Sequence, residues 1–535
     1  MKLFSPSVWS QFPTTNFLFG FSLCSRFVVC VLVTSSLVHA LPGELSADAE
    51  KLVIAHYMTD MVPQTNRTPI RWVDPELADP HGSTAAVGGL HQTKPMAFLH
   101  LPNMDLMQAV DFEIRAARQL GVDGFQFYYP LGDNTATLAP RYNQIIRTFL
   151  QLSQTRYPGF RVSICLSHPN SQKATSEAER IALWSPSIRS LVQSTRDSPA
   201  WLRADSGALL FYLWVGDALA DGVGNLAQTA DQVRKVGLAY QRLSEEIGTP
   251  IEYVYQVRRP AIDLPYIDSI ARTFTAVWGW TASEENIEFW DTLAGCCQET
   301  GCLYTQSVYP DYYTSKVYRK GNTSDTVLPN ALALKIGLEG IERHYRVTNL
   351  AATQIQLLRR AIEHDVRIIN YITWNDYPEG HHLAPEVNHN FGFSLILRYF
   401  KERWKTPAVR LEEDQAIVFY KKYRHDVQPE YSVTLKIKSE NKDLASEDRV
   451  ELVTLLREPA ICYLNARPLG LVPQGLQIHS IPSQPGPVRV RIIRDGQQVI
   501  SFQAPELISS MPFRTDRLTY SYSSVFQREF DRLFK

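Results

Sequence analysis

The sequence predicts an α/β protein: a (β/α)8 TIM barrel followed by a small C-terminal β-sandwich. From about residue 51 to about residue 405, eight short apolar, β-branched or aromatic runs alternate with longer segments of helical periodicity. After about residue 406 the helical periodicity gives way to short strands separated by turn residues. Alternation of strands and helices favours a parallel sheet covered by helices, and eight such units close into a barrel.

The barrel prediction depends on the spacing of apolar residues. The expected strands are residues 51–58, 124–130, 160–169, 208–217, 251–257, 274–280, 303–310 and 366–375. Between the first two, Met107, Val110, Ile114, Ala117 and Leu120 recur three or four positions apart, which is the period of one helix face. An open doubly wound sheet is the alternative, but no G-x-G-x-x-G pattern follows the first expected strand.

The two ends of the chain have different characters. Residues 411–535 read as the β-sandwich, and Asp495-Gly496 between two alternating runs predicts a tight hairpin. Residues 1–40 resemble a signal peptide, because the apolar run 27–38 precedes a small-x-small site at Val38–Ala40. That run is too short to span a bilayer, which needs roughly 20 residues. We therefore expect a secreted or extracytoplasmic protein, with the barrel over residues 41–405 and no stable membrane span after cleavage.

Composition narrows the class of function. The chain has 54 Lys and Arg against 55 Asp and Glu, so its net charge of −1 does not favour nucleic acid as a partner. Hydrophobic residues make up 44% and charged residues 20%, which excludes a disordered, collagenous or multi-span membrane protein. Aromatic residues make up 11%, which suits either a large core or a protein that binds the flat faces of sugars.

Functional side chains of a parallel barrel lie where its strands end. The residues near those ends that we predict to bind substrate are His56, Tyr57, Tyr128, His168, Trp214, Gln256, Trp278, Trp280, Tyr309, Trp374, Tyr377 and His381. For His56, Trp278 and Trp280, ordinary core packing is the competing interpretation.

The densest polar segment follows the last expected strand and reads WNDYPEGHH over residues 374–382. Asp376 and Glu379 are the candidate catalytic residues, because cleaving a glycosidic bond needs one protonated and one ionised carboxyl group. The same Asp-x-x-Glu pattern also occurs at helix starts, with the aspartate as N-cap. A metal site is a less favoured interpretation of these residues, because their spacing matches no familiar ligand pattern.

These motifs resemble glycoside hydrolase family 71, whose members are endo-acting α-1,3-glucanases. The resemblance rests on VIAHYM, AARQLGVDGFQFYYP and ITWNDYPEGHHLAPE, and it spans about residues 51–405. It implies an inverting mechanism that uses Asp376 and Glu379. Of the two, we favour Glu379 as the acid and Asp376 as the base. It also maps a further essential aspartate onto Asp123, although strand direction places that residue low in the barrel.

The sequence departs from the family at several positions. Pro378 stands where the family has glycine, and Gly380-His381-His382 replaces Ser-His-Tyr. These changes leave the carboxylate pair intact but concern residues that set substrate specificity.

We therefore predict a secreted, inverting glycoside hydrolase that acts on α-glucan, and we favour an endo-α-1,3-glucanase. We expect a polysaccharide as the partner, no cofactor, no metal and a monomer. The alternatives are a non-catalytic carbohydrate-binding surface protein and a related barrel hydrolase acting on α-mannosides.

Overall fold

The computed structural model describes residues 50–64, 79, 81–101, 103–322, 325–406 and 408–535. These described residues belong to one compact unit. The predicted signal peptide, residues 1–40, lies outside the described residues. Within the described part of the chain, no helix is both long enough and apolar enough to cross a membrane.

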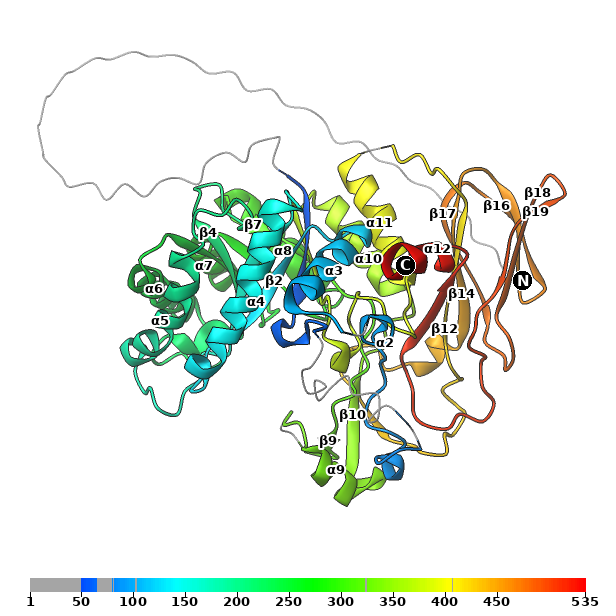
Figure 1. Ribbon diagram of the computed structural model, residues 1–535, viewed down its shortest axis with the longest axis horizontal. Coiled ribbons are helices and arrows are strands. Elements are labelled where there is room, and N and C mark those ends of the chain that lie inside the picture. The colour runs from blue at the N-terminus through cyan, green and yellow to red at the C-terminus, as the bar shows by residue number, and fades with distance from the viewer. Residues whose placement is uncertain (1–49, 65–78, 80, 102, 323–324, 407) are drawn as a thin grey trace, which may run out of the picture. The chain divides into compact units, whose positions relative to one another are not determined.

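A parallel sheet of nine strands forms the centre of the barrel (Figure 1). Its strands are β1 (Leu52–Tyr57), β2 (Gly124–Pro130), β3 (Arg161–Ser167), β4 (Leu209–Trp214), β5 (Ile251–Gln256), β6 (Ala276–Trp278), β7 (Leu303–Tyr304), β8 (Gln306–Val308) and β11 (Ile368–Tyr371). The order is β7-β6-β5-β4-β3-β2-β1-β11-β8. Only Thr305 separates β7 from β8, and this one run pairs with β6 and with β11. The sheet therefore returns on itself, and the predicted parallel barrel is confirmed.

Helices cover the outside of this sheet. They are α3 (Leu106–Gln119), α4 (Thr135–Thr155), α5 (Glu177–Gln193), α6 (Ala230–Ile247), α7 (Leu264–Thr273), α8 (Ile287–Thr300), α10 (Ala352–Glu363) and α11 (Gly392–Lys405). In α3 the side chain of Asp105 accepts a hydrogen bond from Gln108 N at 2.8 Å, and the Gln108 side chain accepts one from Asp105 N, so the helix begins with a capping box. Val110 and Ile114 of the predicted apolar face are buried, whereas Met107 at its start is exposed.

An insertion between the last two barrel strands adds a small sheet. β9 (Tyr318–Arg319) and β10 (Ile341–Tyr345) pair antiparallel, with α9 (Asn330–Ile336) between them in the chain. β10 also pairs in parallel with β13 (Thr434–Ile437), which comes after the barrel. This pairing ties the barrel to the C-terminal part of the chain.

Two four-stranded antiparallel sheets follow. They consist of β17 (Gly475–Pro482), β14 (Arg449–Leu456), β12 (Gln415–Lys421) and β20 (Thr519–Ser523), and of β16 (Arg467–Val472), β15 (Ala460–Leu464), β18 (Arg489–Arg494) and β19 (Gln497–Gln503). Buried side chains of both sheets belong to one hydrophobic cluster, which is what a sandwich requires. The predicted hairpin is present, since Arg494 pairs with Gln497 and both Asp495 and Gly496 have positive φ.

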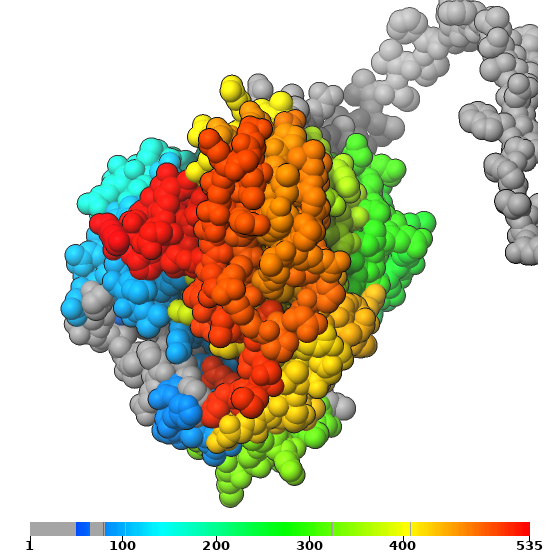
Figure 2. All heavy atoms as spheres, turned by 90° about the vertical axis from the view of Figure 1, so that its right-hand side faces the viewer, coloured from blue at the N-terminus to red at the C-terminus, as the bar shows by residue number. Residues whose placement is uncertain are grey.

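The first C-terminal strand, β12, is buried on both faces. Ala416 and Val418 join the cluster between the two sheets, whereas Ile417 and Phe419 join the core of the barrel. Figure 2 shows the C-terminal strands as one continuous orange-to-red layer, with α12 (Phe526–Phe534) beside blue segments of the barrel. The predicted domain boundary near residues 405–411 stays a prediction, because the cores on its two sides are continuous.

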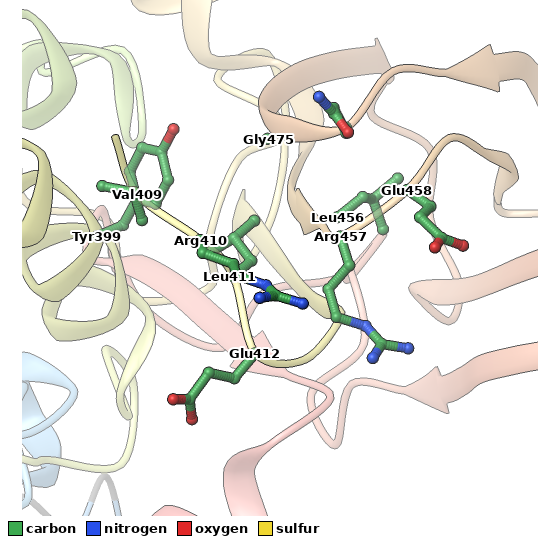
Figure 3. A pocket seen from close by; sticks show the side chains of 10 residues that line it. Tyr399, Val409, Arg410, Leu411, Glu412, Leu456, Arg457, Glu458 and Gly475 are labelled. Atoms are coloured by element: carbon green, nitrogen blue, oxygen red, sulfur yellow. The ribbon is translucent and has the colours of Figure 1, made fainter. Parts of the chain in front are cut away.

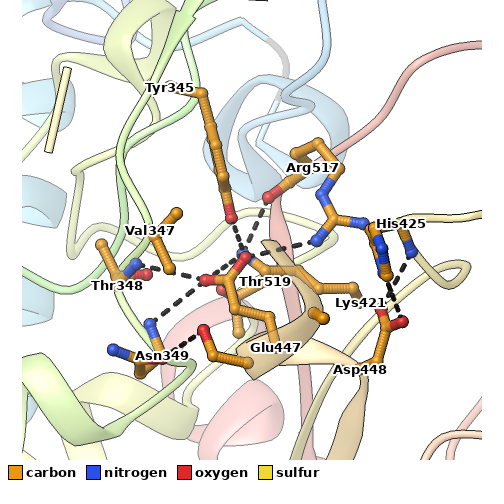
Figure 4. Close-up of polar contacts among 12 residues, drawn as sticks. Tyr345, Val347, Thr348, Asn349, Lys421, His425, Glu447, Asp448, Arg517 and Thr519 are labelled. Carbon is orange, nitrogen blue, oxygen red and sulfur yellow. Dashed lines mark hydrogen bonds and ion pairs between the residues drawn. The ribbon is translucent and has the colours of Figure 1, made fainter. Parts of the chain in front are cut away.

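Buried charges also join the two parts. Glu447 accepts hydrogen bonds from the backbone amides of Thr348 and Asn349, at 3.2 and 3.1 Å, and from Arg517 at 3.2 Å (Figure 4). Thr348 and Asn349 come from the barrel, whereas Arg517 comes from the chain segment before β20. A buried carboxylate with this many partners holds the two chain segments in register.

Candidate functional site

The candidate site is built on the loop that follows β11. Thr373 Oγ1 accepts a hydrogen bond from Asp376 N at 2.9 Å, and a short 3-10 helix then spans Tyr377–Glu379. Gly380 ends this turn with φ of 76°, and a Cβ there would lie 2.6 Å from the Tyr313 carbonyl oxygen. The position therefore needs glycine for both its φ and its close backbone contact.

Asp376 occupies the N-cap position of that turn, but its side chain makes no capping hydrogen bond within this described loop. The capping interpretation of the Asp-x-x-Glu pattern is therefore not supported. Instead, Asp376, Glu379 and His381 each place one oxygen or nitrogen atom within 4.8 Å of the others. The structure thus brings both predicted catalytic carboxylates and the predicted His381 into one cluster.

Glu379 has two positively polarised neighbours. Lys316 Nζ forms an ion pair with Oε1, and His381 Nε2 lies 2.9 Å from Oε2. Asp376 is buried, whereas Glu379 is half-buried. The pair therefore has one carboxyl group in the interior and one at the edge of the site.

The two carboxyl groups differ in proton affinity. Burial raises the pKa of Asp376 above its ordinary value, and the negative charge of Glu379 adds to that rise. Burial also opposes ionisation of Glu379, but the Lys316 ammonium and the His381 hydrogen bond outweigh it and hold the pKa of Glu379 well below its ordinary value. In this state Asp376 is the better proton donor and Glu379 the ionised partner.

Aromatic rings surround the carboxylates. His56 at the end of β1 lies 5.0 Å from Trp280 and 6.5 Å from Trp278, measured between ring centroids. Trp280 also contacts Trp214 at 5.4 Å and His381 at 5.8 Å. The ring centroids of Tyr128 and His168 lie 6.4 and 4.3 Å from that of Trp214. We call this continuous set of rings the aromatic wall. Burial lowers the pKa of His56 to about 3, so its imidazole is neutral.

Part of this wall is open to solvent. Tyr128, Trp214 and Trp280 are partly exposed and His168 is exposed, whereas Trp278 is buried. The Trp278 indole N–H donates to the Leu213 carbonyl at 3.0 Å, so this ring is a core residue beneath the wall. Flat, partly exposed rings beside a carboxylate pair are suited to the apolar face of a pyranose.

Two further predicted binding residues hold the scaffold in place. Gln256 Oε1 accepts a hydrogen bond from Val215 N at 2.8 Å, at the ends of β5 and β4. Tyr309 is buried and its hydroxyl contacts Glu284 and Arg346.

Three predicted binding residues point away from the site. Trp374 is buried against Phe125, and its indole N–H donates to Glu113 of α3. Tyr57 packs between the sheet and α4, because it follows His56 on the strand and alternate side chains face opposite sides. Tyr377 is buried, and its ring packs at 4.9 Å on His382. The prediction that these three bind substrate is not supported by their placement.

The structure does not bring Asp123 to the carboxylate pair. It precedes β2, accepts a hydrogen bond from Val53 N at 2.9 Å and forms a 2.6 Å ion pair with Lys401. The seven residues of β2 extend from there toward the site end, roughly 20 Å at 3.3 Å per residue. Asp123 thus closes the opposite end of the barrel, as strand direction indicated, and the role implied by the resemblance is not supported.

Sequence reasoning missed Lys316 and Tyr312. Both come from the loop after β8, where Tyr312 stacks on His381 at 5.6 Å and Lys316 pairs with Glu379. The only available signal was that this loop follows a predicted barrel strand. No local sequence pattern marks a functional lysine several positions beyond the end of a strand.

A cation could in principle use the oxygens and nitrogen of Asp376, Glu379 and His381. The Lys316 ammonium already contacts Glu379 there and supplies the positive charge. These residues therefore do not fit a metal well.

A separate hollow lies away from this site, between α11 and the C-terminal sheets (Figure 3). Its volume is about 730 Å³, and Tyr399, Arg410, Glu412, Arg457 and Glu458 line it. None of the predicted site residues is among its lining residues, so its size alone does not make it the functional site.

Comparison with solved structures finds distant likenesses. The GH99 endo-α-mannosidase from Bacteroides thetaiotaomicron is 14% identical with a TM-score of 0.43, covering 67% of this chain and 98% of that chain. A glycosyl hydrolase family 2 member from Bacteroides cellulosilyticus is 11% identical with a TM-score of 0.38, covering 74% of this chain and 43% of that chain. No curated protein matches the chain.

Comparison with family models finds one that covers the loop of the site. The model of glycosyl hydrolase family 71 matches residues 355–516, from α10 through the Asp376 loop to the segment before β20. Over these residues, the match confirms the resemblance to glycosyl hydrolase family 71 that the sequence motifs indicate.

Proposed function

We propose that this protein is a glycoside hydrolase that cleaves α-glycans, with α-1,3-glucan as its substrate and endo action as its mode. One observation carries the proposal: Asp376 and Glu379 share one cluster at the end of the last barrel strand but have pKa values shifted in opposite directions. The family 71 match over this loop and the partly exposed rings beside it support the same reaction. Secretion and a monomeric state belong to the proposal as well.

In the proposed reaction Asp376 is the acid. It gives its proton to the glycosidic oxygen, and the bond between that oxygen and the anomeric carbon breaks with its electron pair going to the oxygen. Water attacks the anomeric carbon and passes a proton to Glu379. This reverses the assignment favoured from the sequence, because Lys316 keeps Glu379 ionised.

The inverting course is kept in the proposal because the family resemblance implies it. Inverting enzymes hold their carboxyl groups about 6.5–9.5 Å apart to admit the water. Here one oxygen of Asp376 and one of Glu379 lie within 4.8 Å of each other. Inversion therefore requires the two carboxyl groups to move apart when substrate binds.

Polar atoms are available to orient the substrate. Among the described residues, His56 Nδ1 and His381 Nδ1 are buried without a hydrogen-bond partner. Buried polar atoms normally have partners, so unpartnered ones beside the rings are suited to sugar hydroxyls. They support a carbohydrate ligand over an apolar one.

The test is reducing-sugar release from α-1,3-glucan, with starch and α-mannan as comparison substrates. Asp376→Asn and Glu379→Gln should each lower kcat by about 10²–10⁴-fold, the usual contribution of one acid or base. Asp365→Asn, on the exposed surface, is the control and should retain full activity. Near-normal turnover in both site variants would overturn the assignment. Binding without release from any glycan would favour the non-catalytic alternative, and release from α-mannan alone would favour the mannoside one.

The stereochemical course has its own readout. Proton NMR at early times should show the β-anomer as the first product of α-glucan cleavage, because inversion changes the configuration at the anomeric carbon. An α-anomer as first product would contradict inversion and would fit the short separation of the two carboxylates.

A further inference from the structure

Behind the catalytic loop lies a second cluster of ligand-type side chains that the proposed hydrolysis does not use. His382, Glu386 and His389 are 0%, 0% and 3% exposed, and each offers one ligand atom within 4.8 Å of the others. The segment that carries them connects the catalytic loop to α11.

The distances in this cluster are too long for hydrogen bonds. His382 Nε2 lies 3.7 Å from Glu386 Oε1, and His389 Nδ1 lies 3.9 Å from the same oxygen. Among the described residues, three of these ring nitrogens have no hydrogen-bond partner: Nδ1 and Nε2 of His382, and Nδ1 of His389. Unpartnered buried nitrogens are costly, so this arrangement calls for a further group between them.

Those distances fit the edges of a coordination tetrahedron. Zinc binds histidine nitrogen and carboxylate oxygen at about 2.0–2.2 Å, which places neighbouring ligand atoms roughly 3.4 Å apart. The observed separations of 3.7 and 3.9 Å need only a small contraction.

The surroundings hold the ligands in position. Glu386 Oε2 accepts a hydrogen bond from Asn388 N at 2.9 Å, and Oε1 accepts one from His389 N. On the far side of the His389 ring, Nε2 lies 3.3 Å from Asp311 Oδ2. A carboxylate on the second nitrogen is the usual way in which a metal-binding histidine is oriented.

The charge of the interior also leaves room for a cation. Asp311 and Glu447 lie close to Lys421, Glu447 also lies close to Arg517, and all four side chains are at most 2% exposed. Figure 4 shows the part of this network around Glu447. Among the described residues, no lysine or arginine forms an ion pair with Glu386, so a divalent cation would offset the negative charge of this carboxylate.

We propose that His382, Glu386 and His389 form a buried zinc site that fixes the catalytic loop to the start of α11. His382 Nε2, Glu386 Oε1 and His389 Nδ1 are the three protein ligands. His381, which contacts Glu379, is the chain neighbour of His382, so the metal supports the catalytic loop from its buried side. This zinc site takes no part in the proposed hydrolysis, and the two proposals are tested by separate experiments.

The experiment measures bound metal directly. The full chain without a histidine tag is produced with zinc in the medium, dialysed against metal-free buffer and analysed by mass spectrometry for transition metals. We expect about one zinc per chain in the wild type and at least a fivefold loss in His382→Gln and His389→Gln. His479→Gln, which changes a histidine outside these clusters, should keep the wild-type zinc content.

Wild-type protein provides a readout that does not depend on variants folding. Refolding with Co²⁺ in place of zinc should give the visible absorption of a four-coordinate cobalt site, and one equivalent of Zn²⁺ should abolish it. The proposal would be overturned by less than 0.1 zinc per wild-type chain after production with zinc, together with no four-coordinate cobalt absorption after refolding. Wild-type zinc content in both histidine variants would also overturn it.

Discussion

The Lys316 ammonium forms an ion pair with the Glu379 carboxylate although 63 residues separate them in the chain. Lys316 comes from the loop after β8, and Glu379 comes from the loop after β11. These strands are neighbours in the barrel, so the pair forms only when the sheet closes. Through this contact the closure of the barrel sets the ionisation of a candidate catalytic group.

Replacing Lys316 should therefore change the pH dependence of hydrolysis. In Lys316→Met the lost positive charge raises the pKa of Glu379, and the acidic limb of kcat/KM moves to higher pH by about 1–3 units. Lys320→Met, at an exposed position, should leave the profile in place. An unchanged acidic limb in Lys316→Met would show that Glu379 ionises independently of this lysine.

Replacing Trp280 should weaken substrate binding, whereas replacing Trp374 should lower the stability of the fold. Trp280→Ala removes a partly exposed ring of the site and should raise KM by roughly tenfold, or about 1.4 kcal/mol. Trp374→Phe removes the donor to Glu113 and should lower the unfolding free energy by about 1–3 kcal/mol with KM unchanged. Steady-state kinetics and urea unfolding measure both. A raised KM in Trp374→Phe would instead support the prediction that Trp374 binds substrate.

Asp123 should be a stability residue. Asp123→Asn breaks the 2.6 Å ion pair with Lys401 at the far end of the barrel. We expect a loss of about 1–3 kcal/mol in unfolding free energy, with kcat within a factor of two or so of the wild type below the unfolding transition. A loss of kcat by orders of magnitude in a stably folded variant would instead support the role implied by the family resemblance.

Glu113 should make stability depend on pH. Burial raises its pKa to about 8, although its hydrogen bonds from Trp374 and Tyr57 oppose the rise. The folded state therefore holds a proton that the unfolded state loses near pH 4.5, so this contribution is full below pH 4.5 and is lost as pH rises to about 8. Glu113→Gln should flatten the fall in thermal unfolding midpoint between pH 5 and pH 8. An equally steep fall in the variant would contradict the assignment.

The sequence by itself determined the barrel, the last strand and the carboxylate pair that follows it. These features are local: apolar periodicity marks each strand and helix, and Asp376 and Glu379 lie three residues apart on one loop. The Asp495-Gly496 hairpin was predictable for the same reason, since two residues with positive φ specify the turn.

Only the tertiary structure decided which side chains meet in the site. Trp374 belongs to the motif loop yet turns toward Glu113, because a position next to a strand does not fix the face on which an aromatic ring packs. Lys316 joins Glu379, and β10 pairs with β13, through contacts between distant segments that no local period records. The roles of the two carboxyl groups depend on burial and neighbouring charge, and both arise only when the barrel closes.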